Sequence, residues 1–216
     1  MEFLVVGCIT LLISIIVSFG YYKRLQPRWL QSFAWYLLFI LIVQFVAYFY
    51  SHYTKKSNHF IINTIDAVGF LFYFLIFFKT FHKPKPKRII IIMAFVFILF
   101  FLYHIFWGAG FFVYDSTSYS AGSIFIIICC LVYFYSLFQS ELNLNYFRMP
   151  MFWISTGLLF FFVGSSIYGS LLPYIVNHNL DPHGNFFKAI MVTLNLLLYG
   201  LFAYGFLSNQ IWKIET

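Results

Sequence analysis

A single aspartate lies inside a long apolar stretch of this sequence. Asn63 precedes Asp66 by three positions, and Tyr73 follows it by seven. In a helix these residues share one face, because positions three, four or seven apart lie close together on the helical surface. A carboxylate there can anchor a ligand or sense protons, whereas an ionised carboxylate facing lipid would cost about 2.5 to 3.5 kcal/mol. Asp66 is therefore predicted to face the interior of a helical bundle or water.

Several other polar side chains interrupt apolar segments elsewhere in the chain. We expect them to form, with Asp66, a polar cavity that is open to the outer side and binds a ligand, and we expect Asp66 to pair with His104. The alternative is that these side chains hydrogen-bond between neighbouring helices and only hold the bundle together. The predicted ligand-binding residues are Asp66, Asn63, His104, Ser123, Tyr168 and Asn195.

Recognisable catalytic and metal-binding patterns are missing from the sequence. It contains no HExxH, GxSxG, CxxC or glycine-rich phosphate loop. His178 and His183 flank Asp181, a spacing that can hold a metal but that arises easily by chance. Lys188 lies at the mouth of the last apolar segment, and the next lysine is Lys213, so a retinal protein is disfavoured. We predict no catalytic residue, no metal and no cofactor.

The segments that must position these residues are strongly apolar. Apolar residues make up 62% of the 216 and charged residues 9%, and the mean hydropathy is +0.88, which excludes a water-soluble fold. A transmembrane helix needs about 20 apolar residues, and no alternating pattern suggests a barrel. The sequence predicts an all-α membrane protein, with residues 1–216 forming one domain of seven transmembrane helices: Phe3–Tyr22, Leu30–Tyr50, Phe60–Phe81, Arg88–Trp107, Ala121–Gln139, Pro150–Leu172 and Phe187–Ser208.

The connections carry further expectations. Pro173 is predicted to end the sixth span, and residues 79–88 are predicted to form a stiff basic turn that contacts anionic headgroups. Residues 108–120 are predicted to form a long outer connection, which is rich in aromatic residues. Within the sixth span, Ser165 with Gly169 forms a pair of small residues, as does Ser166 with Ser170, and such pairs allow close helix approach.

The basic residues indicate the orientation, because short cytoplasmic connections retain lysine and arginine. With the N-terminus outside and the C-terminus in the cytoplasm, ten of the thirteen basic residues fall on the inner side. The net charge of +7 then needs no nucleic-acid partner, and the lipid bilayer is the expected partner. The ten inner residues are Lys23, Arg24, Arg28, Lys79, Lys83, Lys85, Lys87, Arg88, Arg148 and Lys213.

Three segments together resemble the seven-helix membrane regions of some Bacteroidota sensor histidine kinases and of related stand-alone membrane proteins. They read INTIDAVGFLFYFLIFFKTF from Ile62, PMFWISTGLLFFFVGSSIY from Pro150 and LNLLLYGLFAYGFL from Leu194. The chain departs from the kinase form in ending at Thr216, without the expected phospho-accepting histidine or ATP-binding domain. The resemblance implies a sensory or scaffold module in a bacterial cytoplasmic membrane that acts through another protein.

We therefore expect a non-enzymatic, receptor-like or accessory membrane protein that senses a ligand or membrane state and signals through a cytoplasmic or membrane partner. The main alternative is a small transporter or channel, and another is an intramembrane lipid-modifying enzyme. Neither the ligand nor the oligomeric state follows from the sequence.

The orientation can be tested directly. A reporter fused after Thr216 is expected on the cytoplasmic side, and one placed near Asp115 on the outside, because of the distribution of basic residues. Enzymatic reporters that are active on only one side of the membrane measure this. If both reporters reported the same side, a span would have been miscounted.

Overall fold

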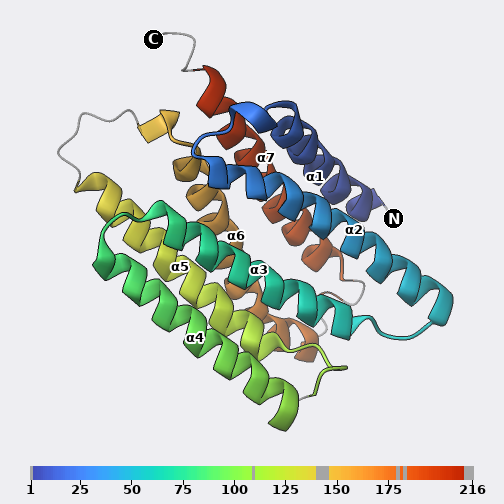
Figure 1. The fold of residues 1–216 in the computed structure, drawn as a ribbon. Helices are drawn as coiled ribbons and strands as arrows, with labels where there is room; N and C mark the ends of the chain where they lie inside the picture. Colours follow the sequence, from blue (N-terminus) through green and yellow to red (C-terminus); the bar gives the residue numbers. More distant parts are fainter. Residues whose placement is uncertain (1, 109, 140–145, 179–180, 182–183, 212–216) are drawn as a thin grey trace. The chain divides into compact units, whose positions relative to one another are not determined.

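The computed structural model describes residues 2–108, 110–139, 146–178, 181 and 184–211. In this part of the chain every regular element is helical, and there is no strand. Figure 1 shows the helices α1 (Glu2–Gly20), α2 (Gln31–Thr54), α3 (His59–Thr80), α4 (Pro84–Trp107), α5 (Ser116–Phe138), α6 (Pro150–Asn177) and α7 (Asn185–Ile211), and short 3-10 helices lie at Tyr22–Arg24, Arg28–Leu30 and Tyr146–Arg148.

Six of these helices are long and apolar enough to cross a membrane. They are α2 to α7, and α1 adds a shorter apolar helix near the N-terminus. Many large apolar side chains are exposed, and α4 has the smallest buried share of the six, 17% of its most apolar stretch. Such surfaces need lipid around them. The prediction of an all-α, multi-pass membrane protein is confirmed to this extent.

The helices group into two compact units. Unit 1 comprises Met1–Leu37 and Phe134–Thr216, and unit 2 comprises Leu38–Tyr133. In unit 1, α7 packs against both α1 and α6. Phe202 and Phe206 of α7 are fully buried and contact the ring of Phe33 at centroid distances of 5.5 and 5.9 Å.

Glycines allow α6 and α7 to approach closely. A Cβ at Gly164 would lie 2.6 Å from Leu194, one at Gly157 would lie 3.3 Å from the carbonyl oxygen of Leu198, and one at Gly205 would lie 3.0 Å from that of Pro150. Small residues have this role in membrane proteins because lipid supplies no hydrophobic force between helices.

The prediction that Gly169 makes such a close approach is wrong. Nothing lies within 4 Å of a Cβ built at that position. Its predicted partner Ser165 is buried and donates its hydroxyl to the carbonyl oxygen of Phe162, within the same helix.

Unit 2 is built from α3, α4, the remainder of α2 and most of α5. Phe97 of α4 packs its ring against Phe70 and Phe74 of α3, at centroid distances of 5.1 and 6.0 Å. All three side chains are at most 2% exposed. Gly122 of α5 lies against Phe70, and an added Cβ would come within 2.7 Å of the ring. The aromatic rings therefore fix the spacing of α3, α4 and α5.

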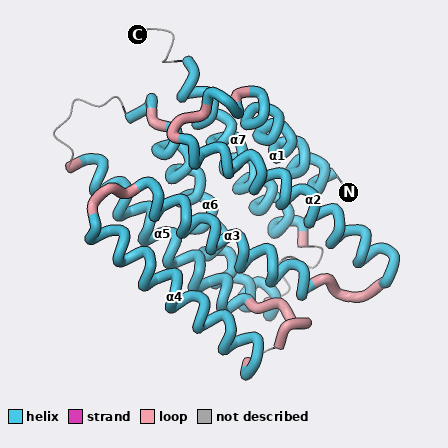
Figure 2. The backbone as a smooth tube through the Cα atoms, viewed as in Figure 1, coloured by secondary structure: helices cyan, strands magenta, loops and turns pink. Residues whose placement is uncertain are grey.

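Three predicted boundaries are corrected. α6 continues through Pro173 to Asn177, which membrane helices tolerate because neighbouring groups satisfy the freed backbone. α5 begins at Ser116 instead of Ala121, because Asp115 caps it, and the connection between α4 and α5 is correspondingly shorter than predicted (Figure 2). α4 begins at Pro84, a proline position suited to a first helical turn.

The early start of α4 also corrects the predicted basic turn. Only residues 81–83 connect α3 to α4, so Lys85, Lys87 and Arg88 lie on helical backbone. Nζ of Lys87 lies 5.0 Å from the ring centroid of Phe78. Positive charge at a helix N-terminus opposes the helix dipole, and this first turn contains no acidic residue. Contact with anionic headgroups remains a prediction for these residues.

The packing at Gly122 generates a stability prediction. Gly122→Ala is expected to lower the melting temperature in detergent, because overpacking a tight core costs about 1 to 3 kcal/mol. That cost exceeds the gain of about 1 kcal/mol from replacing a helical glycine by alanine. Gly200→Ala is the matched control, since its Cβ would meet nothing within 4 Å. Equal or higher stability of both variants would contradict the packing argument.

Candidate functional site

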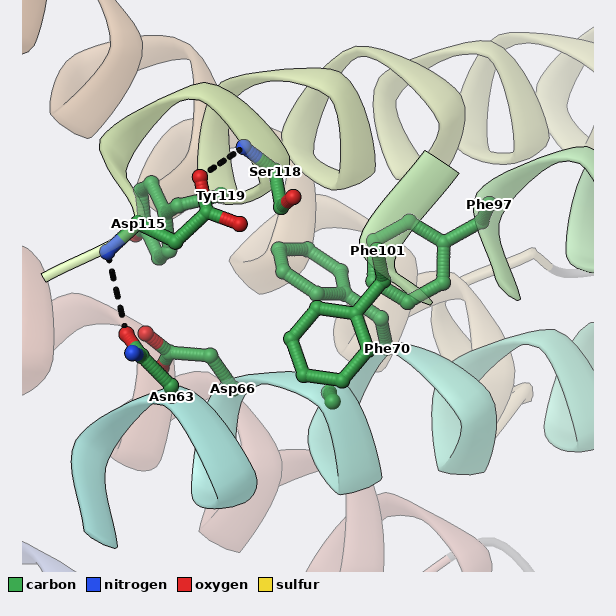
Figure 3. A pocket seen from close by; sticks show the side chains of 9 residues that line it. Asn63, Asp66, Phe70, Phe97, Phe101, Asp115, Ser118 and Tyr119 are labelled. Atoms are coloured by element: carbon green, nitrogen blue, oxygen red, sulfur yellow. Dashed lines mark hydrogen bonds between the residues drawn. The ribbon is translucent and has the colours of Figure 1, made fainter. Parts of the chain in front are cut away.

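A small cavity lies within unit 2, near the beginning of α3. Its polar lining comes from Asn63 and Asp66 of α3, from Asp115 and from Ser118 of α5. Figure 3 shows Asp66 and Asp115 on opposite sides of it. The space open to the centre of a water molecule is about 10 Å³, which suits about one water-sized occupant. The full lining is Asn63, Asp66, Ala67, Phe70, Phe97, Phe101, Asp115, Ser118 and Tyr119.

Asn63 fastens the connection before α5 to the start of α3. Its Nδ2 donates to the carbonyl oxygens of Phe111 at 3.2 Å and Val113 at 2.8 Å. Its Oδ1 accepts from the backbone N–H of Asp115 at 3.1 Å. Asn63 is 3% exposed, and these bonds occupy both of its polar atoms. The residue lines the cavity, and its own contacts position Asp115; its role in ligand binding stays a prediction.

Asp115 is held in place by three elements. One carboxylate oxygen, Oδ1, accepts from the backbone N–H of Ser118 at 3.0 Å, which caps α5. The same oxygen lies 3.5 Å from Nδ1 of His104 on α4. The expected pairing of His104 with Asp66 is therefore wrong: His104 pairs with Asp115, because the backbone of residues 111–115 folds back to α3 and carries this second carboxylate into the cavity.

Two buried oxygens at the cavity have no protein partner. They are Oδ2 of Asp115 and Oγ of Ser118. Asp115 is 6% exposed and Ser118 is 3% exposed. Buried polar atoms are normally hydrogen-bonded, and leaving one unsatisfied costs about 1 to 3 kcal/mol. The cavity therefore presents oxygen atoms that are suited to an additional occupant.

Aromatic rings close the side of the cavity away from Asp66 and Asp115. Phe101 stacks on Phe97 at a centroid distance of 6.1 Å, and Phe70 meets Tyr119 edge-on at 5.8 Å. In Figure 3 the labelled phenylalanines lie together, apart from Asn63, Asp66 and Asp115. Apolar rings lower the local dielectric constant, which strengthens electrostatic interactions inside.

Tyr114 lies in the connection between α4 and α5, where the carboxylates of Asp66 and Asp115 influence its phenol. Partial burial of the phenol raises the pKa of Tyr114 above its ordinary value, and the charges of Asp66, Tyr119 and Asp115 raise that pKa further. The phenol therefore stays protonated at neutral pH and remains a hydrogen-bond donor beside the two carboxylates.

The remaining predicted site residues do not line this cavity. The hydroxyl of Ser123 donates to the carbonyl oxygen of Tyr119 in its own helix, at 2.8 Å. Asn195 donates in the same way to the carbonyl oxygen of Met191. Tyr168 and Asn195 both belong to unit 1, whereas the cavity lies in unit 2. Of the six predicted residues, Asn63 and Asp66 line this cavity, and His104 contacts its lining residue Asp115.

The weak metal pattern near the start of α7 gains no support among the described residues. Asp181 caps α7 by accepting from the backbone N–H of Asn185 at 2.7 Å. His178 lies 3.0 Å from the carbonyl oxygen of Tyr174, and His183 lies outside the described residues. No group of three or more histidine, cysteine or acidic residues able to hold a metal occurs in the described part of the chain.

Sequence reasoning missed Asp115, Ser118 and Tyr119 as lining residues. A signal was present, since aspartate followed by Ser-Thr-Ser and an apolar run is typical of a helix N-terminus. That signal predicts the cap of α5, but it does not predict that the capping carboxylate turns toward Asp66.

Comparisons with protein families, curated proteins and solved structures find no match to this chain, so the argument about function rests on the geometry of the cavity.

Asn63→Ala is expected to destabilise the protein by about 1 to 3 kcal/mol, because it leaves two carbonyl groups and one backbone N–H without their partner. The measurement is thermal unfolding in detergent, with proteolysis at residues 111–115 as a local probe. Thr64→Ala is the control, since this exposed hydroxyl bonds only within its own helix. Equal effects of the two substitutions would disprove the anchoring role of Asn63.

Proposed function

We propose that the chain is a receptor-like or accessory membrane protein that binds a small ligand in the Asp66–Asp115 cavity and acts through a partner protein. In this proposal it has seven spans, with the N-terminus outside and the C-terminus in the cytoplasm. A bacterial cytoplasmic membrane is the proposed location, in keeping with the resemblance to sensor kinase membrane regions.

One observation carries the proposal. Asp66, within an apolar candidate span, lines the same cavity as the buried carboxylate of Asp115. Ionisable groups within spans are expensive, and they commonly mark ligand or ion sites. A purely structural pair of side chains would satisfy its own polar atoms, whereas Oδ2 of Asp115 has no hydrogen-bond partner.

The surroundings of the cavity favour a sensing role. Residues 111–115 connect α4 to α5, and Asn63 ties this connection to α3. An occupant that contacts Asp115 therefore acts on a segment that is bonded to three helices. Binding changes the equilibrium between conformations when the occupant has different affinities for them. The ends of α3, α4 and α5 are the parts that would transmit such a change.

The aromatic wall argues against a channel at this site. Phe70, Phe97 and Phe101 lie directly behind the polar groups, and the rings of Phe70 and Phe97 are almost completely buried. A conduction path needs a continuous polar or hydrated route, and the cavity offers room for about one water. A transporter would have to open this wall during its cycle.

The proposed orientation gives each end of unit 2 a separate role. The cavity lies at the beginning of α3, and the basic cluster of Lys79, Lys83, Lys85, Lys87 and Arg88 lies where α3 ends and α4 begins. Positive charges favour the cytoplasmic side and anionic headgroups. The cavity then faces outward, and the basic cluster offers a cytoplasmic surface for lipid or for a partner.

Asp66→Asn tests the proposal, because it removes the charge while retaining size and hydrogen-bonding capacity. The tagged protein is purified from native membranes after crosslinking, and its co-purifying proteins are quantified together with its thermal stability. We expect a partner that is enriched with the native sequence to be lost from Asp66→Asn while stability is unchanged. Asp181→Asn is the control, since asparagine also caps helices and Asp181 lies outside the cavity.

Identical partner profiles for all three proteins would refute the sensing role of Asp66. Loss of stability together with loss of the partner would identify Asp66 as a structural contact instead. Solute flux or lipid turnover by the purified protein in liposomes would favour the transporter or the enzyme over the receptor.

A further inference from the structure

We propose that the cavity between Asp66 and Asp115 is a sodium-ion site. This inference deepens the proposed function, because it names the class of ligand that the same cavity takes. It rests on the positions of the two carboxylates, on the unpartnered buried oxygens and on the size of the cavity.

The donor set consists of oxygen atoms. Asp66 and Asp115 contribute carboxylates, and Ser118 contributes a hydroxyl. Oxygen ligands of this kind bind hard cations, whereas thiolates and imidazoles favour transition metals. Nδ1 of His104 lies 3.5 Å from Oδ1 of Asp115, so the histidine contacts a different carboxylate oxygen from the unpartnered Oδ2.

The unpartnered oxygens are held in place. Oδ1 of Asp115 binds the N–H of Ser118 and faces His104, and the backbone N–H of Asp115 binds Asn63. The other carboxylate oxygen, Oδ2, is buried without a hydrogen-bond partner, as is the hydroxyl of Ser118. A site whose ligands are already ordered loses little conformational entropy when an ion binds.

The negative charge of the two carboxylates also favours a bound cation. Within the described part of the chain, no lysine or arginine forms an ion pair with Asp66 or Asp115. Two carboxylates in a partly buried site repel each other, and burying an uncompensated charge is costly. A cation bound between the two carboxylates would relieve this repulsion.

The small space and the few oxygen ligands favour a small monovalent cation such as sodium. The cavity accepts about one water-sized occupant. Ca²⁺ takes six to eight oxygen ligands, and Mg²⁺ retains several of its waters, so both need more ligands than the two carboxylates and one hydroxyl of this lining. An organic ammonium ligand is too large.

Purified full-length protein in detergent provides the test, with direct ²²Na⁺ binding and thermal unfolding in NaCl or in choline chloride at equal ionic strength. We expect saturable ²²Na⁺ binding and a melting temperature that NaCl raises by about 3 to 6 °C at ten times the dissociation constant. Choline chloride should produce no such rise. Parallel titrations with CaCl₂ and MgCl₂ determine whether a divalent ion competes.

Variants assign the site. Asp66→Asn is expected to abolish ²²Na⁺ binding, and Ser118→Ala to weaken it about tenfold or more, because a ligand to a charged group is lost. Ser118→Ala also removes an unsatisfied buried hydroxyl, so its stability in choline chloride should be unchanged or higher. Ser120→Ala, an exposed serine of the same helix whose hydroxyl bonds to the carbonyl oxygen of Ser116, should bind sodium normally.

Absence of ²²Na⁺ binding, with equal melting temperatures in both salts, would overturn the proposal and leave a water molecule as the occupant. Binding that survives in Asp66→Asn, or tighter competition by Ca²⁺ or Mg²⁺, would overturn it as well. These measurements need no partner protein. Failure of sodium binding therefore leaves the partner assay of the proposed function intact, and failure of that assay does not affect ion binding.

Discussion

The fixed position of Asp115 is the constraint on which the cavity depends. Its backbone N–H bonds to Asn63 of α3, and its carboxylate caps α5 and pairs with His104 of α4. Asp115 thereby links the consecutive helices α3, α4 and α5. Because the carboxylate is almost fully buried, its bonds form in a medium where they are stronger than in water. The same medium makes its remaining free oxygen costly.

The cavity combines polar groups with an aromatic wall, and the two depend on each other. The ring of Phe70 packs against the ring of Phe97 and against α5, where Gly122 lacks the side chain that would collide with it. Asp66, although it belongs to an apolar helix, lines this small polar space.

The two units use the membrane environment in different ways. In unit 1, glycines bring the backbones of α6 and α7 together, and buried phenylalanines of α7 pack on Phe33. Unit 2 leaves much of α4 exposed and has its polar cavity at the beginning of α3. In the absence of a hydrophobic force between helices, close packing and hydrogen bonds are the available sources of specificity.

The sequence by itself determined the all-helical membrane class, because segments of about 20 apolar residues have no other stable arrangement in a bilayer. It also pointed to Asp66 and Asn63 as polar residues of one helix face, and both line the cavity. A polar residue in such an apolar segment needs a polar environment. Helix boundaries were less certain: Pro173 lies inside α6, and α5 starts five residues early because Asp115 caps it. Periodicity shows which side of a helix is polar, but it does not measure where a helix begins.

Only the tertiary structure decided which polar residues meet. Asp115 is distant from Asp66 in the sequence, and the return of residues 111–115 to α3 brings both into one cavity. The sequence alone allows His104 to pair with either carboxylate, and in the fold it pairs with Asp115. Ser123 and Asn195 have the same residue types as true lining residues, but each bonds within its own helix. Such choices depend on helix rotation and loop path, which follow from the packing of side chains distant in the sequence and not from local pattern.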